Sequence, residues 1–170
     1  MDFSGIQYEA LLLLGRHPDV LAQLREKITY LMVDEYQDTN TIQEQILLLL
    51  AGRRNNICVV GDDDQGLYRF RGATIRNILE FPQLFPPNNC TQVRLTVNYR
   101  SHPGIIDFYT AWMERLNWEE HGKKFRFPKQ ILPREDSFPE VPAVVRLSAS
   151  DENGGNENWH AAVLAFLTAL

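Results

Sequence analysis

The sequence predicts an α/β fold, in which a parallel sheet is covered by helices on both faces. Three short runs of apolar and β-branched residues have the character of buried strands, at 28–33, 57–60 and 93–97, and polar residues follow each run at once. Helix-like segments separate the runs, so the order is strand, helix, strand, helix, strand. This alternation predicts right-handed crossovers and a doubly wound sheet, whose ligands bind beyond the carboxyl ends of the strands.

The segment between the first two runs has the signals of a complete helix. Asn40 followed three residues later by Gln43 forms the pattern of a capping box, and Gly52 is suited to ending the helix. Between the second and third runs, residues 72–89 predict a helix that is closed by prolines. These helices supply the crossovers between the strands.

Beyond Arg100 the pattern changes, which predicts that a second unit starts there. The segments that follow are an amphipathic stretch at 102–118, a basic loop at 121–134, a strand at 142–150, a connector at 151–158 and an apolar helix at 159–170. The last helix has no polar face and no polar finish, so we expect that the chain is cut short and that the partner of this surface is missing. The basic loop could bind a nucleic-acid backbone, but a solvated loop explains its composition better.

Composition indicates a globular, soluble protein of the cytoplasm. The net charge is −5, so the average field does not attract nucleic acid, and any DNA contact needs a local patch. The longest apolar runs are far shorter than the ~20 residues that a membrane-spanning helix needs, and no secretory signal is present. The two cysteines, Cys58 and Cys90, lack the spacing of a metal or redox site. We therefore expect reduced thiols and no membrane partner.

Two adjacent carboxylates, Asp34 and Glu35, directly follow the first predicted strand. At the mouth of a sheet, one carboxylate can hold a hydrated Mg²⁺ while the other takes a proton from an attacking water. Phosphoryl transfer to water needs both roles. A strand that ends in two acids can also be a solvated strand end, but the longer pattern DEYQDTN favours the chemical interpretation.

The second predicted strand is followed by a cluster that mixes an amide, aromatic rings and cations. Gln65 can both donate and accept a hydrogen bond, and Tyr68, Phe70 and Arg71 place rings next to a guanidinium. Rings of this kind can stack on unpaired bases while a guanidinium grips the phosphates. A turn with two half-buried rings and solvated arginines explains the same residues equally well.

The third predicted strand is followed by Tyr99 and Arg100, which could stack on a purine and reach the charge developing on a phosphate. The tripeptide is unspecific when it is taken alone. The three clusters together indicate a nucleotide-handling α/β domain without naming it.

In order and spacing, the patterns DEYQDTN, VVGDDDQGLYRFRGA and NYRS resemble the second, third and fourth motifs of superfamily 1 DNA helicases of the UvrD/Rep/PcrA type. The resemblance is close over residues 2–101 and looser over 102–170. It implies an incomplete RecA-like P-loop NTPase motor core. Residues 1–97 would form the C-terminal part of the first motor domain, and residues 98–170 the hinge and the start of the second.

The resemblance also implies a role for each residue of a site for ATP and Mg²⁺. Asp34 would hold the Mg²⁺, Glu35 would be the general base for the attacking water, and Gln65 would sense the γ-phosphate. Tyr99 would stack on the adenine, and Arg100 would act as the arginine finger. The activity implied is ATP hydrolysis coupled to 3′–5′ movement on single-stranded DNA.

Single-stranded DNA would be contacted by Tyr68, Phe70 and Arg71. Gly66 stands where many members of the family have serine, a departure that removes none of these ligands. The pathway stays open between repair, replication restart and plasmid maintenance.

The phosphate-binding pattern GxxxxGK[ST] does not occur in these 170 residues, where the only Gly-Lys pair is Gly122-Lys123. Without that loop the β-phosphate has neither a backbone nest nor a lysine. We therefore expect activity to need the missing remainder of the helicase motor. The alternative is a truncated or degenerate module that binds DNA or a partner protein without catalysis.

Overall fold

The computed structural model of the chain describes residues 2–134, 144–145 and 158–169, and it divides into two compact units. The first unit comprises Met1–Arg94 and Asn117–Pro128, and the second comprises Leu95–Leu116 and Lys129–Leu170. The chain therefore enters the second unit after Arg94, returns to the first at Asn117 and leaves it again after Pro128. None of the described helices is long and apolar enough to cross a membrane.

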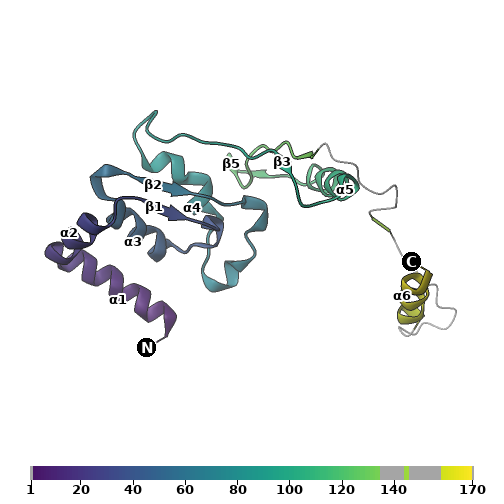
Figure 1. Cartoon of the computed structure of the whole chain (residues 1–170), viewed down its shortest axis with the longest axis horizontal. Helices are drawn as coiled ribbons and strands as arrows, with labels where there is room; N and C mark the ends of the chain where they lie inside the picture. The colour runs from purple at the N-terminus through teal and green to yellow at the C-terminus, as the bar shows by residue number, and fades with distance from the viewer. Residues whose placement is uncertain (1, 135–143, 146–157, 170) are drawn as a thin grey trace. The chain divides into compact units, whose positions relative to one another are not determined.

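The first unit is built on two parallel strands, β1 (Leu31–Val33) and β2 (Ile57–Val59) (Figure 1). Their pairing continues beyond the strand ends, because the Val60 amide donates to the Val33 carbonyl at 2.8 Å and the Tyr36 amide donates to the Val60 carbonyl at 2.9 Å. Parallel strands need a crossover, and the helix between them supplies it. The predicted α/β character is confirmed for these two strands.

The crossover helix, α3 (Thr41–Ala51), begins and ends where local sequence signals place it. The Asn40 side chain accepts from the Gln43 amide, and the Gln43 side chain accepts from the Asn40 amide, each at 2.9 Å. The helix ends at Gly52, whose φ of 55° is a conformation that favours glycine. Both predictions are confirmed.

Three further helices pack in the first unit: α1 (Phe3–Arg16), α2 (Pro18–Lys27) and α4 (Ile75–Glu80). The first two contact each other and α3, whereas α4 packs on the turn that follows β1. The proline-closed helix predicted from residues 72–89 is confirmed by α4 and the 3₁₀ turn Phe81–Leu84. The sequence interpretation did not include α1 and α2.

Two parts of the predicted sheet are wrong for the described residues. The run at 93–97 does not join β1 and β2, and its residues Val93 and Leu95 are 80% and 87% exposed. A strand forms only where a neighbour takes up its backbone hydrogen bonds, and here only the end of the run finds one. Nor are both faces of the sheet covered, since Met32 and Cys58, which lie opposite each other, are exposed.

The second unit contains a short parallel pair and two helices. The pair is formed by β3 (Val97–Asn98) and β6 (Leu132–Pro133), and the helices are α5 (Pro103–Met113) and α6 (Asn158–Ala169). These helices confirm the predictions at 102–118 and 159–170. The predicted strand at 142–150 and the connector at 151–158 lie outside the described residues, apart from 144–145 and 158.

Candidate nucleotide and nucleic-acid site

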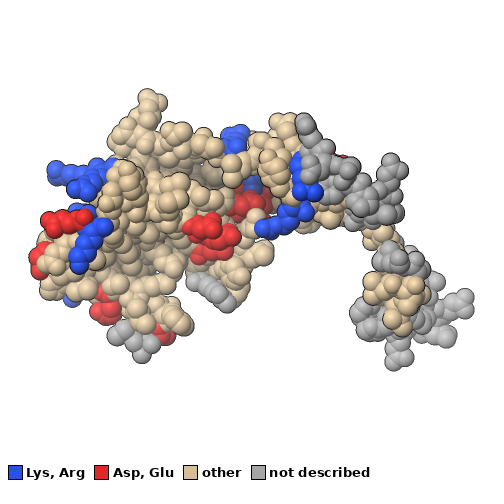
Figure 2. Space-filling view, viewed as in Figure 1, with Lys and Arg blue, Asp and Glu red and all other residues tan. Residues whose placement is uncertain are grey.

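The predicted metal ligand Asp34 and the predicted general base Glu35 lie at the carboxyl end of β1 and are exposed. Figure 2 shows acidic side chains on the surface at this end of the strand. One oxygen of Asp34 accepts from the Glu35 amide at 2.9 Å, and the other makes no hydrogen bond with the described residues. A hard cation such as Mg²⁺ prefers an available carboxylate oxygen of this kind.

Glu35 has a left-handed backbone, with φ 50° and ψ 42°, which is uncommon for a residue other than glycine. The residue that follows explains how this conformation is held. Tyr36 is fully buried, its ring packs edge-on against Phe81 at 5.2 Å, and its hydroxyl donates to Glu44 at 3.0 Å. Burial, and then the charge and hydrogen bond of Glu44, raise the pKa of the Tyr36 phenol well above its usual range. The acid pair is therefore fixed by the core directly behind it.

Gln37 joins the acid pair to the turn after β2. Its side chain is 1% exposed, its amide nitrogen donates to Glu35 Oε2 at 2.6 Å, and its oxygen accepts from the Asp62 amide at 3.0 Å. A Cβ on Gly61 would lie 2.5 Å from that oxygen, so only glycine allows this approach. Sequence reasoning gave Gln37 no role, although a glutamine inside a buried turn is a signal that both ends of its amide are bonded.

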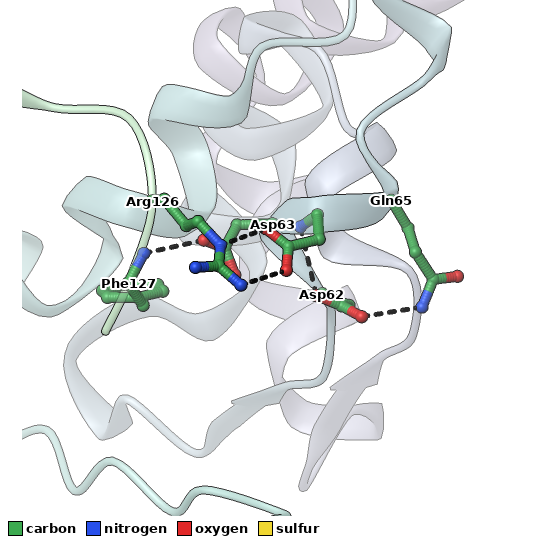
Figure 3. A network of polar contacts seen from close by, with 6 residues as sticks. Asp62, Asp63, Gln65, Arg126 and Phe127 are labelled. Atoms are coloured by element: carbon green, nitrogen blue, oxygen red, sulfur yellow. Dashed lines mark hydrogen bonds and ion pairs between the residues drawn. The ribbon is translucent and has the colours of Figure 1, made fainter. Parts of the chain in front are cut away.

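The turn after β2 carries Gln65, the predicted γ-phosphate sensor. Gln65 is exposed, and its amide nitrogen donates to Asp62 Oδ2 at 2.8 Å, as Figure 3 shows. The other oxygen of Asp62 accepts from the Asp64 amide at 3.1 Å. Glu35, Gln37, Asp62 and Gln65 thus form a continuous chain of contacts from one strand end to the other.

The carboxylates of Asp62, Asp63 and Asp64 offer oxygens within 4.8 Å of one another. The contacts of this acidic cluster are with the protein itself, since Phe127 donates its amide to Asp63 and Arg126 pairs with Asp64. We therefore interpret the cluster as a polar network of the protein and not as a metal site.

Two of the predicted DNA contacts, Tyr68 and Phe70, lie in the 3₁₀ segment Tyr68–Arg71 and are 41% and 79% exposed. Their ring centroids are 6.0 Å apart and their planes are inclined by 49°. The exposure of Phe70 argues against the alternative of two half-buried rings and leaves its face accessible to a base. The side chain of Arg71 lies outside what the structure describes.

Tyr99 and Arg100 follow β3 in the second unit, and both are exposed. The Asn98 side chain fixes the backbone there, because its oxygen accepts from the amides of Arg100 and Ser101 at 2.9 and 2.8 Å. The first unit brings together the predicted metal, base and sensor residues, whereas Tyr99 and Arg100 belong to the second unit. A hollow lined by Arg25, Leu31 and Asn56, among others, lies at the amino ends of these strands and has no part in this site.

Comparison with known proteins identifies the family. Residues 1–86 match the family described as UvrD/REP helicase N-terminal domain. The protein named ATP-dependent DNA helicase PcrA from Leuconostoc citreum is 42% identical over 130 residues, which are 72% of this chain and 17% of that relative. Proteins of the same name are 44% identical over 106 residues in Bacillus subtilis (strain 168), covering 62% of this chain and 14% of the relative, and 43% identical over 107 residues in Staphylococcus aureus (strain Mu50 / ATCC 700699), covering 63% and 14%.

The chain thus spans between 14% and 17% of the length of these relatives. The family match covers 86 of the 170 residues and includes both turns that carry the acid pair and Gln65. On this evidence the chain belongs to the UvrD/Rep helicase family.

Proposed function

We propose that the chain is the central part of an ATP-dependent DNA helicase motor. Residues 1–97 would belong to the first RecA-like domain, and residues 98–170 would form the hinge and the start of the second. The observation that carries this proposal is the chain of contacts from Glu35 through Gln37 and Asp62 to Gln65. Such a chain links the group that would activate water to the group that would sense the phosphate.

The local geometry fits attack of water on the γ-phosphate of ATP, which breaks the phosphoanhydride bond to the β-phosphate. When bound with ATP, Mg²⁺ would neutralise charge on the phosphates, and the available oxygen of Asp34 would hold it. Gln37 donates to Glu35 Oε2, which orients the carboxylate and leaves Oε1 to accept the proton of the attacking water. Both acids are exposed, so a water and a nucleotide can reach them.

Coupling to DNA would run through the turn after β2. Gln65 and the exposed rings of Tyr68 and Phe70 are separated by only a few residues. Loss of the γ-phosphate at Gln65 would therefore change how these rings contact the DNA bases. Tyr99 and Arg100 would bind the adenine and the phosphate when the two motor domains close, and repeated closure would drive 3′–5′ movement.

Cys58 and Cys90 are free thiols, which supports the proposed cytoplasmic location.

The test of catalysis is ATP hydrolysis, stimulated by single-stranded DNA, by this chain joined to the segment that carries the phosphate-binding loop. Glu35→Gln is expected to lower kcat by about a hundredfold or more while nucleotide binding is retained, because general base catalysis typically contributes this much. Glu9→Gln, at an exposed glutamate of α1, is the matched control. A rate that Glu35→Gln leaves unchanged would refute the assigned role.

A second set of measurements addresses DNA. Phe70→Ala should weaken binding of a labelled oligothymidylate, because stacking of an aromatic ring on a base is worth about 1–3 kcal/mol, whereas Tyr30→Ala should not. Strand displacement from duplexes with a 3′ or a 5′ tail tests the direction, and preference for the 5′ tail would contradict it.

The binding-only alternative, which the absence of GxxxxGK[ST] favours, fails if the 170 residues alone turn over ATP.

A further inference from the structure

The segment Asn117–Pro128 packs on the first unit, although the chain on both sides of it belongs to the second. It starts with an antiparallel hairpin, β4 (Glu119–Glu120) and β5 (Lys123–Lys124). The hairpin turns at His121 and Gly122, which have φ values of 50° and 72°. Its base is closed by the Phe125 amide, which donates to the Trp118 carbonyl at 2.8 Å. The hairpin therefore fixes where the residues that follow it, Arg126 and Phe127, lie on the first unit.

Those residues hold the turn after β2. Arg126 forms a two-bond ion pair with Asp64, with Nε and Nη2 donating to the two carboxylate oxygens at 2.8 and 3.0 Å. Next to it, the Phe127 amide donates to Asp63 Oδ2 at 2.7 Å (Figure 3). The side chains of Arg126 and Asp64 are only 12% and 6% exposed, so water competes little for these bonds. A forked pair of this kind fixes orientation as well as distance.

Two cation–π contacts accompany this ion pair. The Arg126 guanidinium lies 5.7 Å from the centre of the Trp118 ring, and the Arg76 guanidinium of α4 lies 4.9 Å from the centre of the Phe125 ring. Cations at these distances are attracted to the faces of the rings. The hairpin segment is thus fastened both to the turn and to the helix that follows the turn.

The turn itself holds no residue that is buried as a whole between 61 and 67, although the Asp64 side chain is 6% exposed. Gln65 is exposed, and its side-chain amide donates to Asp62. Asp63 and Asp64 both accept hydrogen bonds from the hairpin segment. We propose that Arg126 is a positioning residue, which holds the Asp62–Gln65 turn and so presents the Gln65 amide in a fixed direction. The role of that amide at a phosphate rests on the proposed function; the positioning does not.

Amide hydrogen exchange and NMR of the full 170-residue chain test the proposal without ATP or DNA. Arg126→Ala should speed exchange at residues 63–67 by about tenfold to a hundredfold, the range expected for losing hydrogen bonds between charged groups. The side-chain amide signal of Gln65 should shift, while exchange in α1, α2 and α3 stays unchanged. Lys124→Ala, on the exposed part of the same hairpin, is the control and should change neither.

Two more variants separate positioning from general stability. Asp64→Ala should reproduce the local effect, and the double variant should add little to either single one, because both remove the same contact. Arg126→Lys should show a smaller local effect, since an ammonium cannot form the fork, and it provides the readout should Arg126→Ala fail to fold. Unchanged exchange at 63–67, an equal rise along the whole chain, or full additivity would each overturn the proposal. Failure of the ATP hydrolysis test would remove the phosphate role of Gln65 and leave this result intact.

Discussion

The turns after β1 and β2 meet at one end of the same sheet, but they are held by different forces. The turn after β1 contains three buried residues, Tyr36, Gln37 and Thr39, and is therefore part of the core. The turn after β2 has none between residues 61 and 67, and polar contacts from Gln37 and Arg126 hold it. Loss of a buried side chain in the first turn should therefore weaken the whole unit, whereas loss of the Arg126 contact in the second should act locally.

The largest effect is expected from Tyr36→Ala. It removes a fully buried ring, its contact with Phe81 and the hydrogen bond to Glu44, so the free energy of unfolding should fall by about 3–5 kcal/mol. Tyr30→Ala, at a tyrosine that is 73% exposed, should change it by no more than about 0.5 kcal/mol. Urea unfolding measures both, and equal losses would show that the turn after β1 is not a core element.

Gly61→Ala tests the point where the two turns touch. The new Cβ would lie 2.5 Å from the Gln37 side-chain oxygen and 2.8 Å from Ile78 Cδ1, so one of the turns must move. We expect a loss of about 1–3 kcal/mol, the usual range for overpacking. Gly15→Ala in α1 meets nothing within 4 Å and should stabilise the helix by about 0.5–1 kcal/mol. A neutral Gly61→Ala in urea unfolding would mean that the turns separate easily.

Gln37→Met removes the bridge and keeps most of the volume. The Asp62 amide loses its acceptor and Glu35 loses its donor, so a loss of about 1–2 kcal/mol is expected, together with faster exchange of the Asp62 amide. Gln45→Met, at an exposed position of α3, is the control. If the Asp62 amide exchanged at the same rate in both variants, Gln37 would not connect the turns.

The elements that the sequence predicted correctly have signals confined to a few neighbouring residues. The helix α3 is an example, because Asn40, Gln43 and Gly52 determine its ends through contacts within one turn. The run at 93–97 is rich in apolar and β-branched residues, as β1 is, yet in the structure only its end, Val97, pairs with another strand. Its partner depends on the rest of the sheet, which local pattern does not contain.

The site shows the same division. Asp34 and Glu35 were predictable because they directly follow a strand, and the structure confirms their position at its carboxyl end. The contacts of Gln37 with Asp62 and of Arg126 with Asp64 span 25 and 62 residues, so no spacing rule reveals them. The interpretation of residues 121–134 as a solvated loop is wrong for Arg126, whose side chain is 12% exposed.

The smallest effect is expected at Asp38, where the turn after β1 keeps one unfavourable group. Its Oδ1 is buried and has no hydrogen-bond partner among the described residues, and burial, followed by the nearby Glu35 charge, raises its pKa above 3.8. A raised pKa means that the folded state binds the proton more tightly, so the ionised carboxylate lowers stability as the pH rises through and above that value. Asp38→Asn should therefore stabilise the protein at pH 7, by less than about 1 kcal/mol.

The gain from Asp38→Asn should shrink as the pH falls toward 3.8, because the native carboxyl becomes neutral there as well. Urea unfolding at several pH values measures this dependence. Asp19→Asn is the contrasting control, because this exposed carboxylate lies in the first turn of α2, where a negative charge is favourable, and its loss should slightly destabilise the protein. A stability loss for Asp38→Asn at pH 7 would mean that the carboxylate is stabilising where it lies. The turn after β1 would then, like its neighbour, depend on charge as well as on packing.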